Sequence, residues 1–148
     1  SDKNRIVAKR RSVVAFTPFA SRFPFEVMIV PKRHERDYWR ISDDEATELS
    51  EVVLDVFKKL NRAVPNLSYN MALHTAPFDS RKVLSSKNFI DVMEKPASID
   101  TTLACHYFHW HIEIMPALAR IGGFEKGGSN HINPAIPEQA ALILNSND

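Results

Sequence analysis

Residues Tyr107–Met115 read YFHWHIEIM, which alternates polar with large apolar side chains. Successive side chains of a β-strand point to opposite faces, so this alternation predicts a strand with one face toward the core. On the other face His109, His111 and Glu113 follow one another at a spacing of about 7 Å. We expect the chemistry of the chain on this polar face, because ionisable groups are not concentrated there without hydrogen-bonding partners or a ligand. The apolar positions are Phe108, Trp110, Ile112 and Ile114.

A second predicted strand, Leu67–Thr75, supplies another histidine. Its alternation puts His74 on one face, and we expect the apolar side chains of the opposite face to pack into the core. Strands that are adjacent in sequence often pair, and pairing here would bring His74 to His111 and Glu113. Two imidazoles and a carboxylate suit zinc or iron, so these three residues form a candidate metal site. The face expected in the core carries Tyr69, Met71 and Leu73.

One long helix and several short strands are predicted for most of the remaining chain. Ser42 and Glu45 form a capping-box pattern ahead of apolar residues at helical spacing, which predicts an amphipathic helix over Asp43–Arg62. This helix should lie across one face of an antiparallel sheet, and a last short helix is expected over Pro137–Leu144. The predicted fold class is therefore α+β. The first strands are expected at Ile6–Ala8, Ser12–Thr17 and Phe25–Val30, as a meander.

Two segments show no clear period. Phe78–Leu103 is mostly polar and is predicted to be a long loop, which at that length is usually functional or mobile. Gly122–Gly128 is predicted to be a glycine-rich link, where the backbone could approach a ligand. Lys32 and Arg33, after the third strand, could contact a phosphate, although a solvated loop explains them equally well.

Composition limits the class of protein. The 148 residues suffice for one domain, and 19 basic against 18 acidic residues argue against a general binder of nucleic-acid polymers. No apolar run approaches the roughly 20 residues of a membrane span, so no membrane partner is expected. The single cysteine, Cys105, fits a reducing compartment, and we expect a cytoplasmic protein. The opening residues Ser1–Asn4 are typical of a processed end, so we expect a fragment.

Six segments along the chain carry a resemblance to one known family. HWHIEIMP, at 109–116, resembles the histidine-triad signature, which alternates histidine with apolar residues and ends near a proline. All six in order resemble the C-terminal half of galactose-1-phosphate uridylyltransferase and its relatives, in the histidine-triad superfamily. They span nearly the whole chain and are Pro18–Glu26, Pro31–His34, Leu73–Phe78, Phe108–Pro116, Gly123–Glu125 and Ile132–Pro134.

The resemblance implies a histidine-triad-like fold and an enzyme built from two such halves. In that family a histidine of the N-terminal half attacks the α-phosphorus of UDP-glucose and passes the uridylyl group to galactose 1-phosphate. The His-Pro-His nucleophile of the N-terminal half is not in these 148 residues. The resemblance further implies UDP-sugar and sugar phosphate as ligands, and a homodimer whose interface completes the site.

The same resemblance implies roles for individual residues. His109 falls at the first triad position and His111 at the middle one, which is the nucleophile in active histidine-triad proteins. Glu113 departs from the pattern, because active members have histidine or glutamine there. In the metal-bearing half of the family, the residues matching His74, His111 and Glu113 would bind a structural zinc or iron. The segment expected to contact the sugar of the hexose phosphate is Gly123-Phe124-Glu125.

Three functions are therefore weighed. In the first, the chain is the hexose-phosphate-binding and dimer-forming C-terminal half of a uridylyltransferase, and is inactive alone. In the second, it is a self-sufficient histidine-triad hydrolase or phosphorylase with His111 as nucleophile. In the third, it is a non-catalytic scaffold that a metal stabilises.

Overall fold

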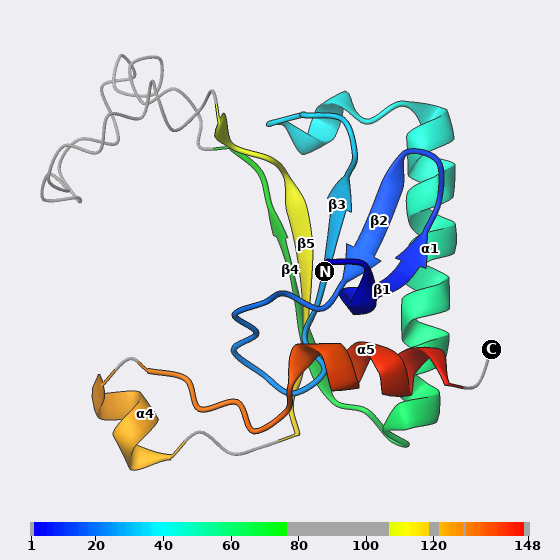
Figure 1. Ribbon diagram of the computed structural model, residues 1–148. Coiled ribbons are helices and arrows are strands. Elements are labelled where there is room, and N and C mark those ends of the chain that lie inside the picture. The colour runs from blue at the N-terminus through cyan, green and yellow to red at the C-terminus, as the bar shows by residue number, and fades with distance from the viewer. Residues whose placement is uncertain (1, 77–106, 119–121, 129, 147–148) are drawn as a thin grey trace, which may run out of the picture.

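Alternating hydrophobic residues in five short segments produce one antiparallel sheet with the strand order β1-β2-β3-β5-β4 (Figure 1). The computed structural model describes residues 2–76, 107–118, 122–128 and 130–146. The predicted loop Phe78–Leu103 and the cysteine Cys105 lie outside the described residues. The strands are β1 (Ile6–Lys9), β2 (Val13–Phe16), β3 (Val27–Pro31), β4 (Tyr69–His74) and β5 (His111–Pro116).

The long helix α1 (Asp43–Ala63) confirms the predicted amphipathic helix. The Ser42 hydroxyl accepts a hydrogen bond from the backbone amide of Glu45, and the Glu45 carboxylate accepts one from the backbone amide of Ser42. Both halves of the capping box are therefore present. One face of the helix packs on β1 and β2. The α+β class is confirmed, with the helix covering one face of the sheet (Figure 1). The buried helix residues are Leu49, Val52, Val56, Lys59 and Leu60.

Two shorter helices follow the sheet. The last helix, α5 (Pro137–Asn145), was predicted, and it buries Ala140, Ala141 and Leu144 against the core beside α1. The glycine-rich link is not irregular throughout, because Gly123–Gly128 forms a short helix, α4. The Glu125 carboxylate organises this turn by accepting the amide of Gly122. Within the described residues no helix combines the length and apolar character needed to cross a bilayer.

Strand β5 starts later than the sequence predicts. The alternation at Tyr107–Met115 predicts a strand from Tyr107, but β5 begins at His111. The reason is that the pairing with both neighbours stops there: His111 pairs with His74, the last residue of β4, and the β3 register with β5 reaches only Ile112, although β3 itself runs to Pro31. Before this point Trp110 is still buried, and its amide donates to the carbonyl of Glu35 rather than to a strand.

The apolar face of β4 is not in the core, contrary to expectation. Tyr69, Met71 and Leu73 are 47%, 56% and 47% exposed. These side chains lie on the same face as the buried Ile112 and Ile114 of β5, with which β4 pairs. However, β4 is an edge strand, and α1 packs mainly on β1 and β2. Of these three side chains, Tyr69 meets the helix, where its ring centroid lies 4.8 Å from that of Phe57.

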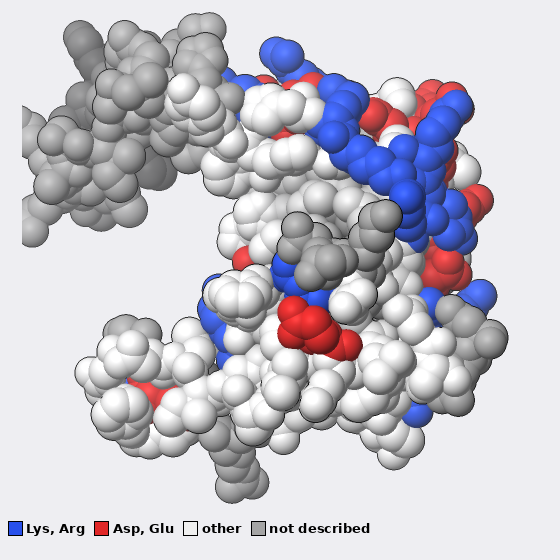
Figure 2. Space-filling view, viewed as in Figure 1, with Lys and Arg blue, Asp and Glu red and all other residues white. Residues whose placement is uncertain are grey.

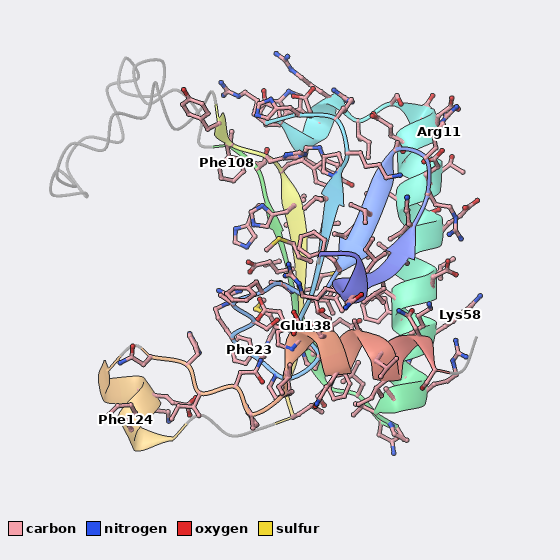
Figure 3. The ribbon with its side chains drawn as sticks, in the orientation of Figure 1. Arg11, Phe23, Lys58, Phe108, Phe124 and Glu138 are labelled. Atoms are coloured by element: carbon pink, nitrogen blue, oxygen red, sulfur yellow. The ribbon has the colours of Figure 1, made fainter. Side chains whose placement is uncertain are left out.

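Basic side chains at the β1–β2 turn are paired with acidic residues of α1. Arg10 bonds Glu51 and Asp55, each at 2.7 Å, and Arg11 lies 3.4 Å from Glu48. Figure 2 shows blue and red atoms side by side in this part of the surface, and Figure 3 labels Arg11 there. This cluster therefore serves to attach the turn to the helix surface.

Candidate metal centre

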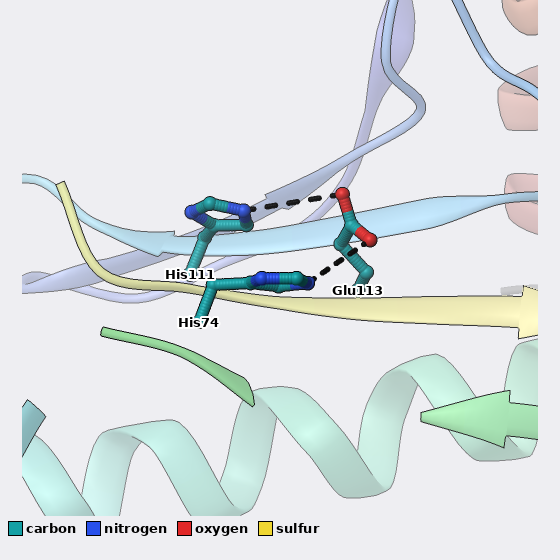
Figure 4. Close-up of side chains that lie close together, drawn as sticks. All are labelled: His74, His111 and Glu113. Atoms are coloured by element: carbon teal, nitrogen blue, oxygen red, sulfur yellow. Dashed lines mark hydrogen bonds and ion pairs between the residues drawn. The ribbon is translucent and has the colours of Figure 1, made fainter. Parts of the chain in front are cut away.

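The β4–β5 pair brings His74, His111 and Glu113 together. His74 is the register partner of His111, and Ala72 is the partner of Glu113, so all three side chains leave the same face of the sheet. One ligand atom from each residue lies within 4.8 Å of the others. Figure 4 shows the two rings and the carboxylate converging. The predicted grouping of these three residues is confirmed.

The carboxylate of Glu113 faces the Nε2 edges of both imidazoles. Its Oε2 is 3.2 Å from Nε2 of His74, and its Oε1 is 3.9 Å from Nε2 of His111 (Figure 4). The rings of His74 and His111 stack with centroids 4.7 Å apart and an interplanar angle of 16°. Both Nε2 atoms therefore face the same carboxylate.

The backbone sets the proton position on His111. Its Nδ1 lies 3.0 Å from the carbonyl oxygen of His109. A carbonyl oxygen can only accept, so this bond places a proton on Nδ1 and leaves the lone pair of the neutral ring on Nε2. Histidines that bind metals are commonly oriented by such a bond from the other ring nitrogen.

The charge of Glu113 is balanced by an arginine from another part of the chain. Arg22 donates to Oε2 of Glu113 at 2.6 Å, and the Glu113 side chain is only 12% exposed. Burial alone raises the pKa of Glu113, but the hydrogen bond and charge of Arg22, with contributions from His74 and His111, lower that pKa below its ordinary value of 4.5. Glu113 is thus a carboxylate at neutral pH.

The donor set fits a zinc or iron ion. Two imidazole nitrogens and one carboxylate oxygen are ligands that both metals accept, and their mutual distances are compatible with contacts to one ion. Three protein ligands leave further coordination positions for water or for another group. The His111–His109 bond provides the outer-sphere orientation expected around such a site.

His109 does not belong to this cluster, although the alternation predicts a pocket shared by His109, His111 and Glu113. It precedes β5, and its Nε2 lies 2.7 Å from the carbonyl oxygen of Pro31. Its ring packs edge-on against His34, with centroids 5.5 Å apart. The strand geometry that would align it with His111 begins only at His111, so the prediction of a shared pocket is wrong for His109.

Lys32 and Arg33 are engaged elsewhere. Lys32 donates through Nζ to the carbonyl oxygens of Arg10 and Arg11 in the β1–β2 turn. Arg33 bonds Glu45 at the start of α1, and this bond holds the pKa of the Glu45 carboxyl at about 2. The structure therefore gives both side chains structural contacts and does not bring them to His74 or His111.

The α4 segment lies apart from the metal cluster. Glu125 accepts the amides of Gly122 and Ile132, which lower the pKa of its carboxyl. Phe124 is 71% exposed, and Figure 3 shows it at the tip of the α4 segment, away from the sheet. Gly123 begins the helix. This group holds its own turn together and presents an apolar side chain to solvent.

Arg22 also belongs to the site, and no sequence pattern predicts its place there. It lies in the irregular segment Pro18–Phe25, which has no β or helical period that would predict where its side chains point. Asn133 holds this segment through its Nδ2, which donates to the carbonyls of Ser21 at 3.0 Å and Phe23 at 3.2 Å. These contacts between distant residues carry no local sequence signal.

The strand order, the helix on one face and the ligand cluster together define an α+β domain of the histidine-triad type. A solved histidine-triad-like protein from Bartonella henselae matches 96% of this chain and 84% of its own, with a TM-score of 0.55 and 16% identity, which supports the fold alone. No protein-family model matches the chain.

Sequence comparison finds relatives among enzymes that act on sugar phosphates or nucleotide sugars. The chain is 29% identical over 142 residues to an ADP-glucose phosphorylase of Arabidopsis thaliana, and 30% identical over 149 residues to a galactose-1-phosphate uridylyltransferase of Thermotoga maritima. Each comparison covers 96% of this chain, but the chain spans only 35% and 40% of the two relatives.

A solved structure agrees with this relationship. An Arabidopsis thaliana ADP-glucose phosphorylase with bound ADP-glucose matches 99% of the chain and 41% of its own, with a TM-score of 0.76 and 25% identity. The chain is thus a relative of the galactose-1-phosphate uridylyltransferases and nucleotide-sugar phosphorylases, within the histidine-triad fold.

Proposed function

We propose that this chain is the C-terminal half of a UDP-glucose–hexose-1-phosphate uridylyltransferase, with the nucleophilic histidine in the other half. One observation carries the proposal: nearly the whole chain matches enzymes named for nucleotidyl transfer or for phosphorolysis of a nucleotide sugar. The match covers about 35–40% of the length of each of these enzymes. The position of Glu113 supports a role other than nucleophilic attack for this half. Its carboxylate holds the His74 imidazole by a 3.2 Å contact and faces the lone pair of His111.

In this proposal His74, His111 and Glu113 hold a structural zinc or iron ion. When bound, the ion supplies a fixed divalent charge and joins the edge strand β4 to β5. The chain itself contributes the orientation: the carbonyl of His109 fixes the ring of His111, and in the metal-free chain Arg22 holds the carboxylate of Glu113 beside the two imidazoles. The side chains of His111 and Glu113 are thereby held in fixed orientations on the polar face of the sheet.

The substrate and partner roles are proposed for surfaces outside this cluster. The α4 segment, with Gly123, Phe124 and Glu125, is proposed to meet the hexose phosphate, and Lys32 and Arg33 its phosphate. These residues do not converge within the described residues, so in this proposal they act with the other half of the enzyme or with the second subunit of a homodimer. The exposed ring of Phe124 is consistent with a surface that is covered in the assembly.

The test is to locate the covalent intermediate in the complete natural protein that contains this chain. The protein is incubated with UDP-glucose labelled in the α-phosphate, and in parallel with labelled ADP-glucose, and the labelled peptide is mapped. We expect an acid-labile label outside these 148 residues, released as product when galactose 1-phosphate or inorganic phosphate is added. No label from either donor, with no product formed, would refute the proposal.

A second candidate function has one observation in its favour. The Nε2 of His111 carries the lone pair of the neutral ring, as a nucleophile at phosphorus requires. A free-standing histidine-triad hydrolase or phosphorylase would then carry the label on His111 itself. The test compares labelling of the isolated chain with labelling of its His111→Ala variant. A label on the wild-type chain that is absent from the variant supports this function. Absence of label from both proteins excludes this function.

A further inference from the structure

The guanidinium of Arg22 lies at the same carboxylate that both histidines face. Its Nη2 donates to Oε2 of Glu113 at 2.6 Å, and the same Oε2 is 3.2 Å from Nε2 of His74. Oε2 of Glu113 therefore contacts the permanent cation of Arg22 on one side and His74, a candidate metal ligand, on the other. A metal ion at His74 and His111 must share this carboxylate with Arg22.

Arg22 is held in place by a second, more deeply buried carboxylate. Glu26 is 2% exposed, and its Oε2 accepts the backbone amides of Arg22 at 2.5 Å and Phe23 at 3.1 Å. Its Oε1 accepts from Nη2 of Arg22 at 3.2 Å. Because a buried carboxylate is costly unless paired, Glu26 keeps the guanidinium near Glu113. Arg22 is consequently part of a built arrangement rather than a loose surface side chain.

We propose that Arg22 is an internal counter-ion that stabilises Glu113 in the metal-free chain and opposes a divalent ion at His74 and His111, so that the two cations compete for the charge of one carboxylate. The proposal rests on the metal centre proposed above. It assigns to Arg22 a positioning role that tunes affinity, and it assigns no contact between Arg22 and substrate.

Charge counting supports the direction of the effect. With neutral imidazoles, Arg22, Glu26 and Glu113 sum to one negative charge, and replacing Arg22 with a neutral residue leaves two. Interactions between charges a few ångströms apart in a partly buried site are strong, so a neutral residue at position 22 should favour a divalent ion. The same change leaves Glu113 and Glu26 without their shared donor, so the metal-free chain should become less stable.

The test compares zinc binding by the wild-type chain with binding by three variants. Arg22→Gln removes the charge, Arg22→Lys keeps it, and Arg11→Gln removes an equal charge at the exposed β1–β2 turn. Zinc affinity is measured by titration against a competing chelator, and thermal unfolding is followed with and without zinc. We expect Arg22→Gln to bind zinc at least about tenfold more tightly, a change worth about 1.4 kcal/mol, with both other variants close to wild type.

The outcomes separate the two proposals. Zinc binding by wild type with equal or weaker binding by Arg22→Gln would overturn the role of Arg22 and leave the metal centre standing. Absence of binding from every protein, in titrations with zinc and with iron alike, would overturn the metal centre and this inference with it. If Arg22→Gln does not fold, the guanidinium NMR signal of Arg22 in wild type decides: it should change on zinc addition while that of Arg11 does not, and an unchanged Arg22 signal would overturn the inference.

Discussion

The two edges of the sheet are finished in different ways. At the β1 edge, Lys59 donates to the carbonyl of Val7 at 2.9 Å and Asn145 donates to the carbonyl of Ile6 at 2.8 Å. At the β4 edge, Met71 and Leu73 are about half exposed, and the strand ends at His74 of the metal cluster. The first edge is capped by side chains from α1 and α5, whereas the second combines an exposed apolar surface with the candidate chemistry.

The difference indicates where this chain is built for stability and where for function. Helix α1 packs on β1 and β2, and α5 packs beside it, so buried contacts accumulate at that end of the sheet. An exposed, uncharged edge strand is a liability in an isolated domain and is usually protected. The β4 edge, with its apolar face and its histidine, is therefore where we expect another half or subunit to be needed.

The largest effect should come from neighbouring positions on β5 and β4. Ile114 is fully buried and pairs in register with the exposed Met71. We expect Ile114→Ala to lower the free energy of unfolding by about 2–5 kcal/mol, and Met71→Ala by less than about 1 kcal/mol, because only the first leaves a cavity. Urea denaturation of both variants measures this. Similar losses for both would show that β4 is covered as well as β5.

The capped edge offers a matched pair of lysines. Lys59 is 8% exposed and hydrogen-bonded to Val7 and Asn145, whereas its neighbour Lys58 is exposed and labelled on the outer surface of α1 in Figure 3. Lys59→Met should cost about 1–3 kcal/mol, because it leaves a buried carbonyl and amide without their donor. Lys58→Met should change little in the same denaturation experiment. Equal effects would contradict the capped edge.

A substitution at the start of α1 tests whether the helix and the metal cluster are independent of each other. Ser42→Ala removes the capping hydroxyl and should lower the free energy of unfolding by about 1 kcal/mol. Zinc affinity at His74 and His111 should not change, because the cap lies on the helix and not on the β4–β5 pair. A loss of zinc affinity in this variant would mean that the helix positions the metal cluster.

Acid should weaken the β4–β5 site through Glu113. Arg22 and the two imidazoles outweigh burial and hold its folded pKa below the ordinary 4.5. A carboxyl with a depressed folded pKa contributes stability above its unfolded pKa, and that contribution is lost as the pH falls through the folded value. Metal-free wild type should therefore lose stability below about pH 4.5 more steeply than Glu113→Gln, in urea midpoints measured against pH. Parallel curves would contradict this ion pair.

Local patterns predicted the elements whose signals are local. The capping box at Ser42 and the helical spacing after it predicted α1, and alternation predicted that β5 would present His111 and Glu113 opposite Ile112 and Ile114. The fate of a strand depends on its neighbours, which a single sequence does not show. For that reason a single sequence predicts neither the exposed face of β4 nor the late start of β5, after His109.

The residues around the cluster show the same limit. Pairing of strands that follow one another in sequence predicted the approach of His74 to His111, since antiparallel register then aligns their faces. Arg22 reaches Glu113 across 91 positions from an irregular segment, and no periodic pattern reports such a contact.

The most direct test of the account is the metal content of the wild-type chain, His74→Ala and His34→Ala, purified after equal exposure to zinc or to iron. His34 is an exposed histidine that packs on His109 and lies outside the cluster, so it controls for general loss of imidazole. We expect one bound ion per chain in wild type and in His34→Ala, and loss of that ion in His74→Ala. Equal metal content in all three proteins, or none in any of them, would contradict it.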